Sequence, residues 1–83
     1  MKRIKIKKQE HSFLEKNRRE IPENIAYLLD LKFFKESIMV TDEQADVLRD
    51  YFIEWQQEVG FNYSYELTNE GEILQRLIDE LYS

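Results

Sequence analysis

The feature that most constrains the fold is the spacing of apolar side chains in residues 42–59. Ala45, Leu48, Phe52, Trp55 and Val59 recur every three or four positions. At 100° per residue they fall within an arc of about 80°, which is the pattern of an amphipathic helix. Thr41 precedes the stretch as an N-cap residue, and Gly60 follows it as a stop. We therefore expect a helix over residues 42–59.

A second helix is predicted at the end of the chain, starting at Thr68 or Asn69. Its inward positions are Ile73, Leu74, Leu77, Ile78 and Leu81. Between the two helices, aromatic and polar residues alternate over residues 61–67, with Phe61, Tyr63 and Tyr65 on one side. The alternation slightly favours a strand, and an ordered loop that carries its aromatics into the core is the alternative.

The N-terminal half is predicted to contain shorter elements. Residues 2–7 alternate basic and apolar side chains, which suits a short edge strand with Ile4 and Ile6 on one side. Ser12 and Glu15 fit a capping box for a helix from 13 to about 20. Pro22 opens a segment, up to about residue 35, that we expect to pack on the two C-terminal helices, and residues 37–40 are expected to be extended. The apolar face of the Pro22 segment consists of Ile25, Leu28, Leu29 and Phe33.

The composition indicates a mainly α fold, with α+β as the alternative. Two Gly and one Pro among 83 residues are few helix breakers, and 42% of the residues are hydrophobic. We expect one domain, residues 1–83, in which residues 1–10 form a basic N-terminal arm or edge strand. The chain has no Cys, which excludes disulfides, thiolate metal sites and a thiol nucleophile.

Catalytic signatures are missing from the sequence. The one histidine, His11, is adjacent to Ser12, and adjacent residues do not form a triad; we expect His11 to be exposed. Gly60 and Gly71 stand alone, so there is no phosphate loop. We expect no enzyme activity, catalytic residue, metal or cofactor. With no signal peptide and no run of apolar residues long enough to span a bilayer, we expect a cytoplasmic protein without a membrane partner.

Charge is sorted along the chain. Residues 1–20 have a net charge of +5 and residues 21–83 of −10, which gives the total of −5. The basic arm has no interleaved aromatics for base stacking, and the acidic body would repel a phosphate backbone. We therefore expect the arm either to fold against its own acidic body or simply to solvate an edge strand, and nucleic acid is not the expected partner.

The acidic residues of the 42–59 helix form a stripe, which we call the acidic stripe: Asp46, Asp50, Glu54 and Glu58. Like charges at a spacing of four residues cost roughly 0.2–0.5 kcal/mol per pair, so the stripe is not what stability alone would select. Tyr51 and Trp55 flank it. Aromatics beside a face of one charge sign are typical of protein-binding surfaces, so these six residues are the candidate partner-binding site. The alternative is a solvated acidic face with both aromatics in the core.

Two family resemblances involve the C-terminal half. The pattern Tyr65-x-Leu67-Thr68-x-x-Gly71-x-x-Leu74 resembles the segment in which the wing of bacterial winged-helix regulators returns into a helix. The 42–59 helix departs from that family because a recognition helix carries basic or amide side chains toward DNA.

The second resemblance covers residues 40–50, 58–61, 67–71 and 77–82. These segments resemble the C-terminal part of small acidic bacterial immunity proteins, which are paired with secreted toxins. The resemblance implies an inhibitor that binds and blocks one cognate toxin domain. The sign of the acidic stripe favours a target with a basic surface, such as the nucleic-acid-binding face of a nuclease. The alternatives are a nucleic-acid-binding regulator with a degenerate winged helix and a homo-oligomeric structural module.

Overall fold

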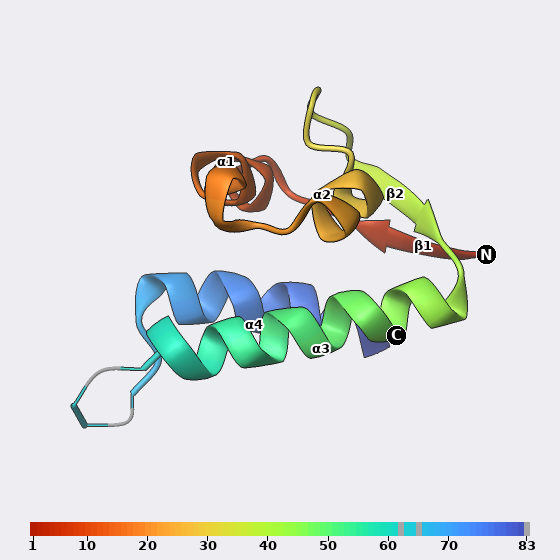
Figure 1. Ribbon diagram of the computed structural model, residues 1–83. Coiled ribbons are helices and arrows are strands. Elements are labelled where there is room, and N and C mark those ends of the chain that lie inside the picture. Colours follow the sequence, from red (N-terminus) through yellow and green to blue (C-terminus); the bar gives the residue numbers. More distant parts are fainter. Residues whose placement is uncertain (62, 65, 83) are drawn as a thin grey trace.

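The computed structural model describes residues 1–61, 63–64 and 66–82 and arranges them in two layers (Figure 1). One layer is a hairpin of the two long helices, α3 (Asp42–Val59) and α4 (Asn69–Tyr82). The other layer holds the remaining elements, and its members are β1 (Lys2–Lys5), α1 (Lys8–Lys16), the 3₁₀ turn η1 (Arg18–Glu20), α2 (Glu23–Leu29) and β2 (Ser37–Val40). The predicted fold class, mainly α with a short N-terminal strand, is confirmed.

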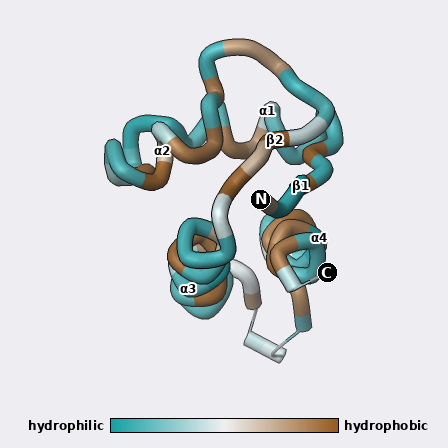
Figure 2. The backbone as a smooth tube through the Cα atoms, turned by 90° about the vertical axis from the view of Figure 1, so that its right-hand side faces the viewer, coloured by the Kyte–Doolittle hydropathy of each residue, from teal (hydrophilic) through white to brown (hydrophobic). Residues whose placement is uncertain are grey.

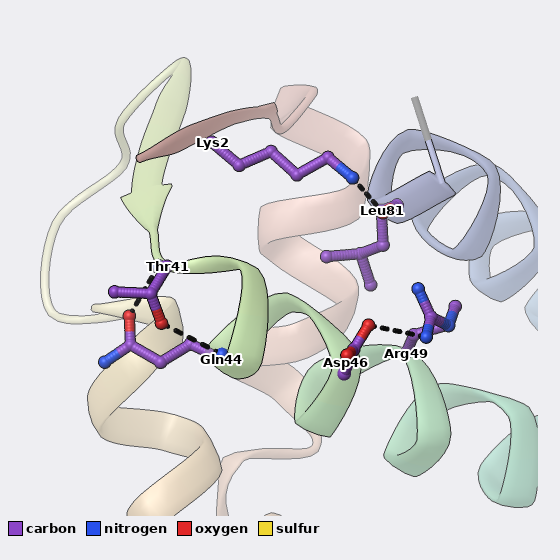
Figure 3. A network of polar contacts seen from close by, with 6 residues as sticks. All are labelled: Lys2, Thr41, Gln44, Asp46, Arg49 and Leu81. Atoms are coloured by element: carbon purple, nitrogen blue, oxygen red, sulfur yellow. Dashed lines mark hydrogen bonds and ion pairs between the residues drawn. The ribbon is translucent and has the colours of Figure 1, made fainter.

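Helix α3 begins where the sequence predicts. Thr41 Oγ1 accepts a hydrogen bond from the Gln44 amide (3.1 Å), and the Gln44 side chain accepts one from the Thr41 amide (2.9 Å; Figure 3). Ala45, Leu48 and Phe52 are buried as expected. Together these contacts fix both the start of α3 and the face that it turns toward the other layer.

The prediction for the last two turns of α3 was partly wrong. Trp55 is half-buried, and Val59 is 40% exposed. The inward position belongs instead to Gln56, which donates hydrogen bonds to the Gly71 carbonyl and the Gln75 side chain (3.0 Å each). The reason is that α4 packs on the side of α3 that carries Gln56, and polar groups of α4 satisfy its amide.

The two glycines set the spacing of the hairpin. Gly60 ends α3 with φ −85°, so it is not a left-handed cap. The Gly60 carbonyl accepts a hydrogen bond from the Thr68 amide (2.8 Å), and Thr68 Oγ1 accepts one from the Gly71 amide (3.1 Å). A Cβ atom on Gly71 would lie 2.1 Å from the Gly60 carbonyl oxygen. The glycines thus allow a close backbone contact rather than an unusual φ angle.

Strands β1 and β2 pair antiparallel, with Ile4 opposite Ile38. Ile4 and Ile6 face the core, as their alternation with basic residues predicts. The Lys2 ammonium donates a hydrogen bond to the Leu81 carbonyl (2.7 Å; Figure 3), so the strand is attached to the end of α4. This bond gives one of the C-terminal carbonyls of that helix a cationic partner.

The predicted start of the first helix was wrong. Helix α1 begins at Lys8, and Ser12 is an exposed residue inside it rather than its N-cap. The capping carboxylate is Glu10, which is buried and accepts a hydrogen bond from the Lys7 amide (2.8 Å). Residues 18–20 form the separate turn η1. The early start also turns His11 inward: it is 8% exposed, not solvated as expected.

The helix predicted after Pro22 is shorter than its apolar pattern. Pro22 is the N-cap of α2, and the helix ends at Leu29 because Asp30 adopts a left-handed conformation (φ 50°). Ile25 and Leu29 are buried, but Phe33 lies beyond the helix and is 70% exposed. The prediction that Phe33 shares the buried face was therefore wrong.

Of the alternatives for residues 61–67, the described residues show no strand: Phe61 and Leu67 form a β-bridge, and residues 63–64 form a turn. Phe61 and Tyr63 are exposed, so they do not enter the core. Asn62 and Tyr65 lie outside the described residues. Within the part of the chain that the structure describes, no helix combines the length and apolar character that crossing a membrane requires.

Candidate functional site

The acidic stripe lies on the solvent-facing side of α3. Leu48 and Phe52, on the opposite side of the helix, are 0% and 1% exposed and pack toward the other layer. Asp46, Asp50, Glu54 and Glu58 are all exposed. At 100° per residue, Asp46, Asp50 and Glu54 lie roughly opposite Leu48 and Phe52 and face away from the layer that contains the sheet. Glu58 lies nearer the buried face, beside the edge of the helix that carries Tyr51 and Trp55.

Only one carboxylate of the stripe has a cationic partner among the described residues. The Arg49 guanidinium forms an ion pair with Asp46 (2.6 Å; Figure 3) and lies over the Tyr82 ring, 4.6 Å from its centroid. The carboxylates of Asp50, Glu54 and Glu58 form no ion pair or hydrogen bond with any residue in the described ranges. Three neighbouring negative charges therefore remain uncompensated on this face.

Trp55 and Tyr51 connect the stripe to the core. Both side chains are half-buried. The Trp55 ring stacks on Phe13 of α1, with the ring centroids 5.1 Å apart and the planes at 22°. The centroid of the Tyr51 ring lies 5.8 Å from that of Trp55. These contacts restrict both rings while leaving part of each accessible beside the stripe. Rigid aromatic surface of this kind loses little conformational entropy when a partner binds.

The Tyr51 hydroxyl lies in a region of negative potential. Burial raises the pKa of Tyr51 above its ordinary value of 10.0, and the nearby carboxylates of Glu20 and Glu58 raise it further. Glu20 belongs to η1, whereas Glu58 belongs to the last turn of α3. Carboxylates from two different elements thus act on the Tyr51 hydroxyl.

Glu20 is the residue of this surface that sequence reasoning missed. It is exposed and belongs to a 3₁₀ turn far from residues 46–58 in the sequence. No local pattern connects it with them, because only the tertiary structure brings the Glu20 carboxylate close enough to raise the pKa of Tyr51. The six residues predicted for the surface all lie on α3.

The chemistry of this surface is that of exposed carboxylates beside aromatic rings, which suits guanidinium and ammonium groups. Over residues 1–61, 63–64 and 66–82, the structure shows no group of three or more His, Cys, Asp or Glu side chains that could hold a metal ion. His11 is buried with its ring against Phe34 (centroids 5.4 Å apart), so it does not contribute to the α3 surface.

The basic arm is part of the fold. Lys2 is bonded to α4, whereas Arg3, Lys5, Lys7 and Lys8 are exposed. The segment between α3 and α4, which would correspond to the wing in a winged-helix protein, has a single bridge among its described residues instead of a strand hairpin. Comparison of the chain with protein-family models, with curated proteins and with solved structures finds no match.

Proposed function

We propose that this chain is a non-enzymatic binding protein whose acidic stripe binds the basic surface of a protein partner. The observation that carries the proposal is the row of uncompensated carboxylates at Asp50, Glu54 and Glu58 on a well-packed helix. Such a row costs on the order of 1 kcal/mol of stability, and the Arg49 ion pair relieves it only at Asp46. A role in binding a basic partner would explain why these carboxylates are present despite the repulsion between them.

The partner's expected chemistry follows from the site. Lysine and arginine side chains would approach the carboxylates, and the accessible parts of Tyr51 and Trp55 would contact the stems of these side chains. Complementary charge accelerates the encounter of two proteins and suppresses wrong partners. We therefore expect fast association that slows as the ionic strength rises.

The specific class we propose is an immunity-type inhibitor of a cognate bacterial toxin that acts in the cytoplasm. The resemblance of residues 40–50, 58–61, 67–71 and 77–82 to small acidic immunity proteins supports this class. A toxin that acts on nucleic acid carries a basic substrate-binding surface, and an acidic inhibitor would cover it. The expected target is thus a toxin domain with a basic face, such as a nuclease.

The experiment is affinity capture with the tagged full chain from native lysate treated with nuclease, followed by quantitative mass spectrometry. Two double variants are compared with the parent chain, D50K/E54K on the acidic stripe and E70K/E72K on α4. Both change the net charge by the same amount, and all four positions are exposed. Circular dichroism verifies that both variants remain folded.

The proposal predicts one stoichiometric protein partner that D50K/E54K loses and E70K/E72K retains. A partner held equally by all three proteins would refute the assignment of the surface to α3. Capture of nucleic acid alone, without a protein partner, would refute the binding class. Inhibition of the purified partner's activity by the parent chain then tests the inhibitor class separately.

A further inference from the structure

The segment between α2 and β2, residues 30–36, presents two phenylalanines to solvent. Phe33 is 70% exposed and Phe34 is 42% exposed, and Lys32 and Lys35 flank them. We call this segment the 30–36 loop. It projects from its layer on the side away from α3 and α4 (Figure 1), with a hydrophobic stretch between hydrophilic ones (Figure 2).

Contacts at both ends hold the 30–36 loop in place. The Asp30 amide donates a hydrogen bond to the Ala26 carbonyl (3.0 Å), and the Asp30 carboxylate forms an ion pair with Lys35. At the other end, the Ile6 amide donates one to the Glu36 carbonyl (2.8 Å). Leu31 is buried, and the Phe34 ring packs edge-on against His11. The 30–36 loop is therefore held in place at both ends, and in this position it exposes Phe33 to solvent.

Strand pairing brings the basic arm beside this loop. Lys5 lies opposite Ser37, the first residue after the loop, and Phe34 lines one groove together with basic residues of the arm. The charged residues of this groove are Arg3, Lys5, Lys7, Lys8 and Arg76 on the basic side and Glu10, Glu36, Asp79 and Glu80 on the acidic side. Residues 1–9 and 30–39 together carry seven Lys and Arg against Asp30 and Glu36, a net charge of +5. The exposed phenylalanines and the basic residues beside them thus come from two segments that are distant in the sequence.

We propose that this surface binds an anionic lipid bilayer, with Phe33 entering the headgroup region and Arg3, Lys5, Lys7 and Lys8 contacting the lipid phosphates. Stable peripheral binding requires two signals, and an inserted apolar group with a basic patch supplies them. The expectation of no membrane partner rested on the lack of a spanning segment, which peripheral binding does not need.

Two observations favour a bilayer over nucleic acid. Phe33 lies on a projecting loop, where it can enter an interface, and the outward positions of β1 and β2 are Arg3, Lys5, Ser37 and Met39, which provide no aromatic platform for bases. The acidic stripe, which faces away from this layer, would point toward solution. The two surfaces are separate, so this proposal does not depend on the proposed function.

The test is flotation of the full chain with vesicles of phosphatidylcholine alone or of equal parts phosphatidylcholine and phosphatidylglycerol. Two variants change the surface, F33S at the loop tip and K7E/K8E in the arm. Their matched controls are Y63S, at a fully exposed aromatic in the other loop, and K16E/R19E, which makes the same charge change elsewhere. Thermal unfolding by circular dichroism verifies the fold of each variant.

We expect the parent chain, Y63S and K16E/R19E to float with the anionic vesicles only. We expect F33S and K7E/K8E to reduce that binding by about tenfold or more. Failure of the parent chain to bind anionic vesicles would overturn the proposal, as would equal loss in F33S and Y63S. Binding of a single-stranded oligonucleotide without vesicle binding would also overturn it and assign the basic residues to nucleic acid.

Discussion

Replacement of Gly71 by alanine tests the close contact that joins α3 to α4. Alanine is the best helix former, so intrinsic propensity alone predicts that G71A stabilises α4 by about 1 kcal/mol. The structure predicts the opposite. The new Cβ would lie 2.1 Å from the Gly60 carbonyl oxygen and 2.9 Å from its carbonyl carbon, closer than Cβ atoms are found to heavy atoms of the backbone.

The expected magnitude follows from what must move. Backbone near Gly60 has to shift by about 1 Å, and overpacking of this kind costs typically about 1–3 kcal/mol. The shift also disturbs the hydrogen bonds from the Thr68 amide to the Gly60 carbonyl and from Gln56 to the Gly71 carbonyl, each worth about 1 kcal/mol. After the gain in propensity, we expect a net destabilisation of about 2 kcal/mol.

The assay is urea unfolding followed by far-ultraviolet circular dichroism, with E72A as the neighbouring control. Glu72 is exposed on the same turn of α4, so its replacement should change stability by about 0.5 kcal/mol or less. A G71A protein as stable as the parent chain, or more stable, would show that the two backbones are not in tight contact and would refute the reasoning.

Three further predictions concern α3. T41A should lower the free energy of unfolding by about 1 kcal/mol, because the Gln44 amide loses the Thr41 hydroxyl that accepts its hydrogen bond. An unchanged urea midpoint would contradict this. D50K should stabilise the chain by roughly 1–2 kcal/mol at low salt by replacing two like-charge pairs with opposite ones. A loss of stability, or a gain unaffected by salt, would argue against repulsion in the stripe. Burial and the carboxylates of Glu20 and Glu58 raise the pKa of Tyr51 in the folded protein above the ordinary value of 10.0. The free energy of unfolding therefore does not depend on this group below pH 10.0, and it decreases as the pH rises from 10.0 through the folded-state pKa, because the unfolded chain loses the proton first. Alkaline titration of tyrosinate absorbance, with Y51F to identify the signal, should show this pKa falling in E58Q, and an unchanged titration in E58Q would rule out the Glu58 contribution.

Much of the candidate surface could be predicted from the sequence because it lies on one helix. The period of α3 places Leu48 and Phe52 on one side and Asp50 and Glu54 on the other, whatever the helix packs against. The effect of Glu20 on Tyr51 could not be predicted, since it depends on where the fold places η1. The accessible part of Trp55 likewise depends on Phe13, which stacks against it.

The errors in the N-terminal half have a common cause. Its elements are short, and competing local signals have similar strength there. Ser12 and Glu15 satisfy the capping-box pattern, but Glu10 caps the Lys7 amide because tertiary burial favours a helix that starts at Lys8. The apolar pattern up to Phe33 extends past α2 because Asp30 ends the helix in a left-handed conformation, which leaves Phe33 exposed in the following loop.

The sequence by itself determined the two long helices, the face that α3 buries up to Phe52, the N-cap of α3 and the separation of charge between the N-terminal arm and the body. These properties depend on neighbours within a few residues, where periodicity and capping act. Only the tertiary structure decided that Gly60 meets Gly71, that Lys2 binds the end of α4, that His11 is buried and that Phe33 projects beside the basic arm. Each of these depends on segments distant in the chain, whose contacts are set by how the two layers pack.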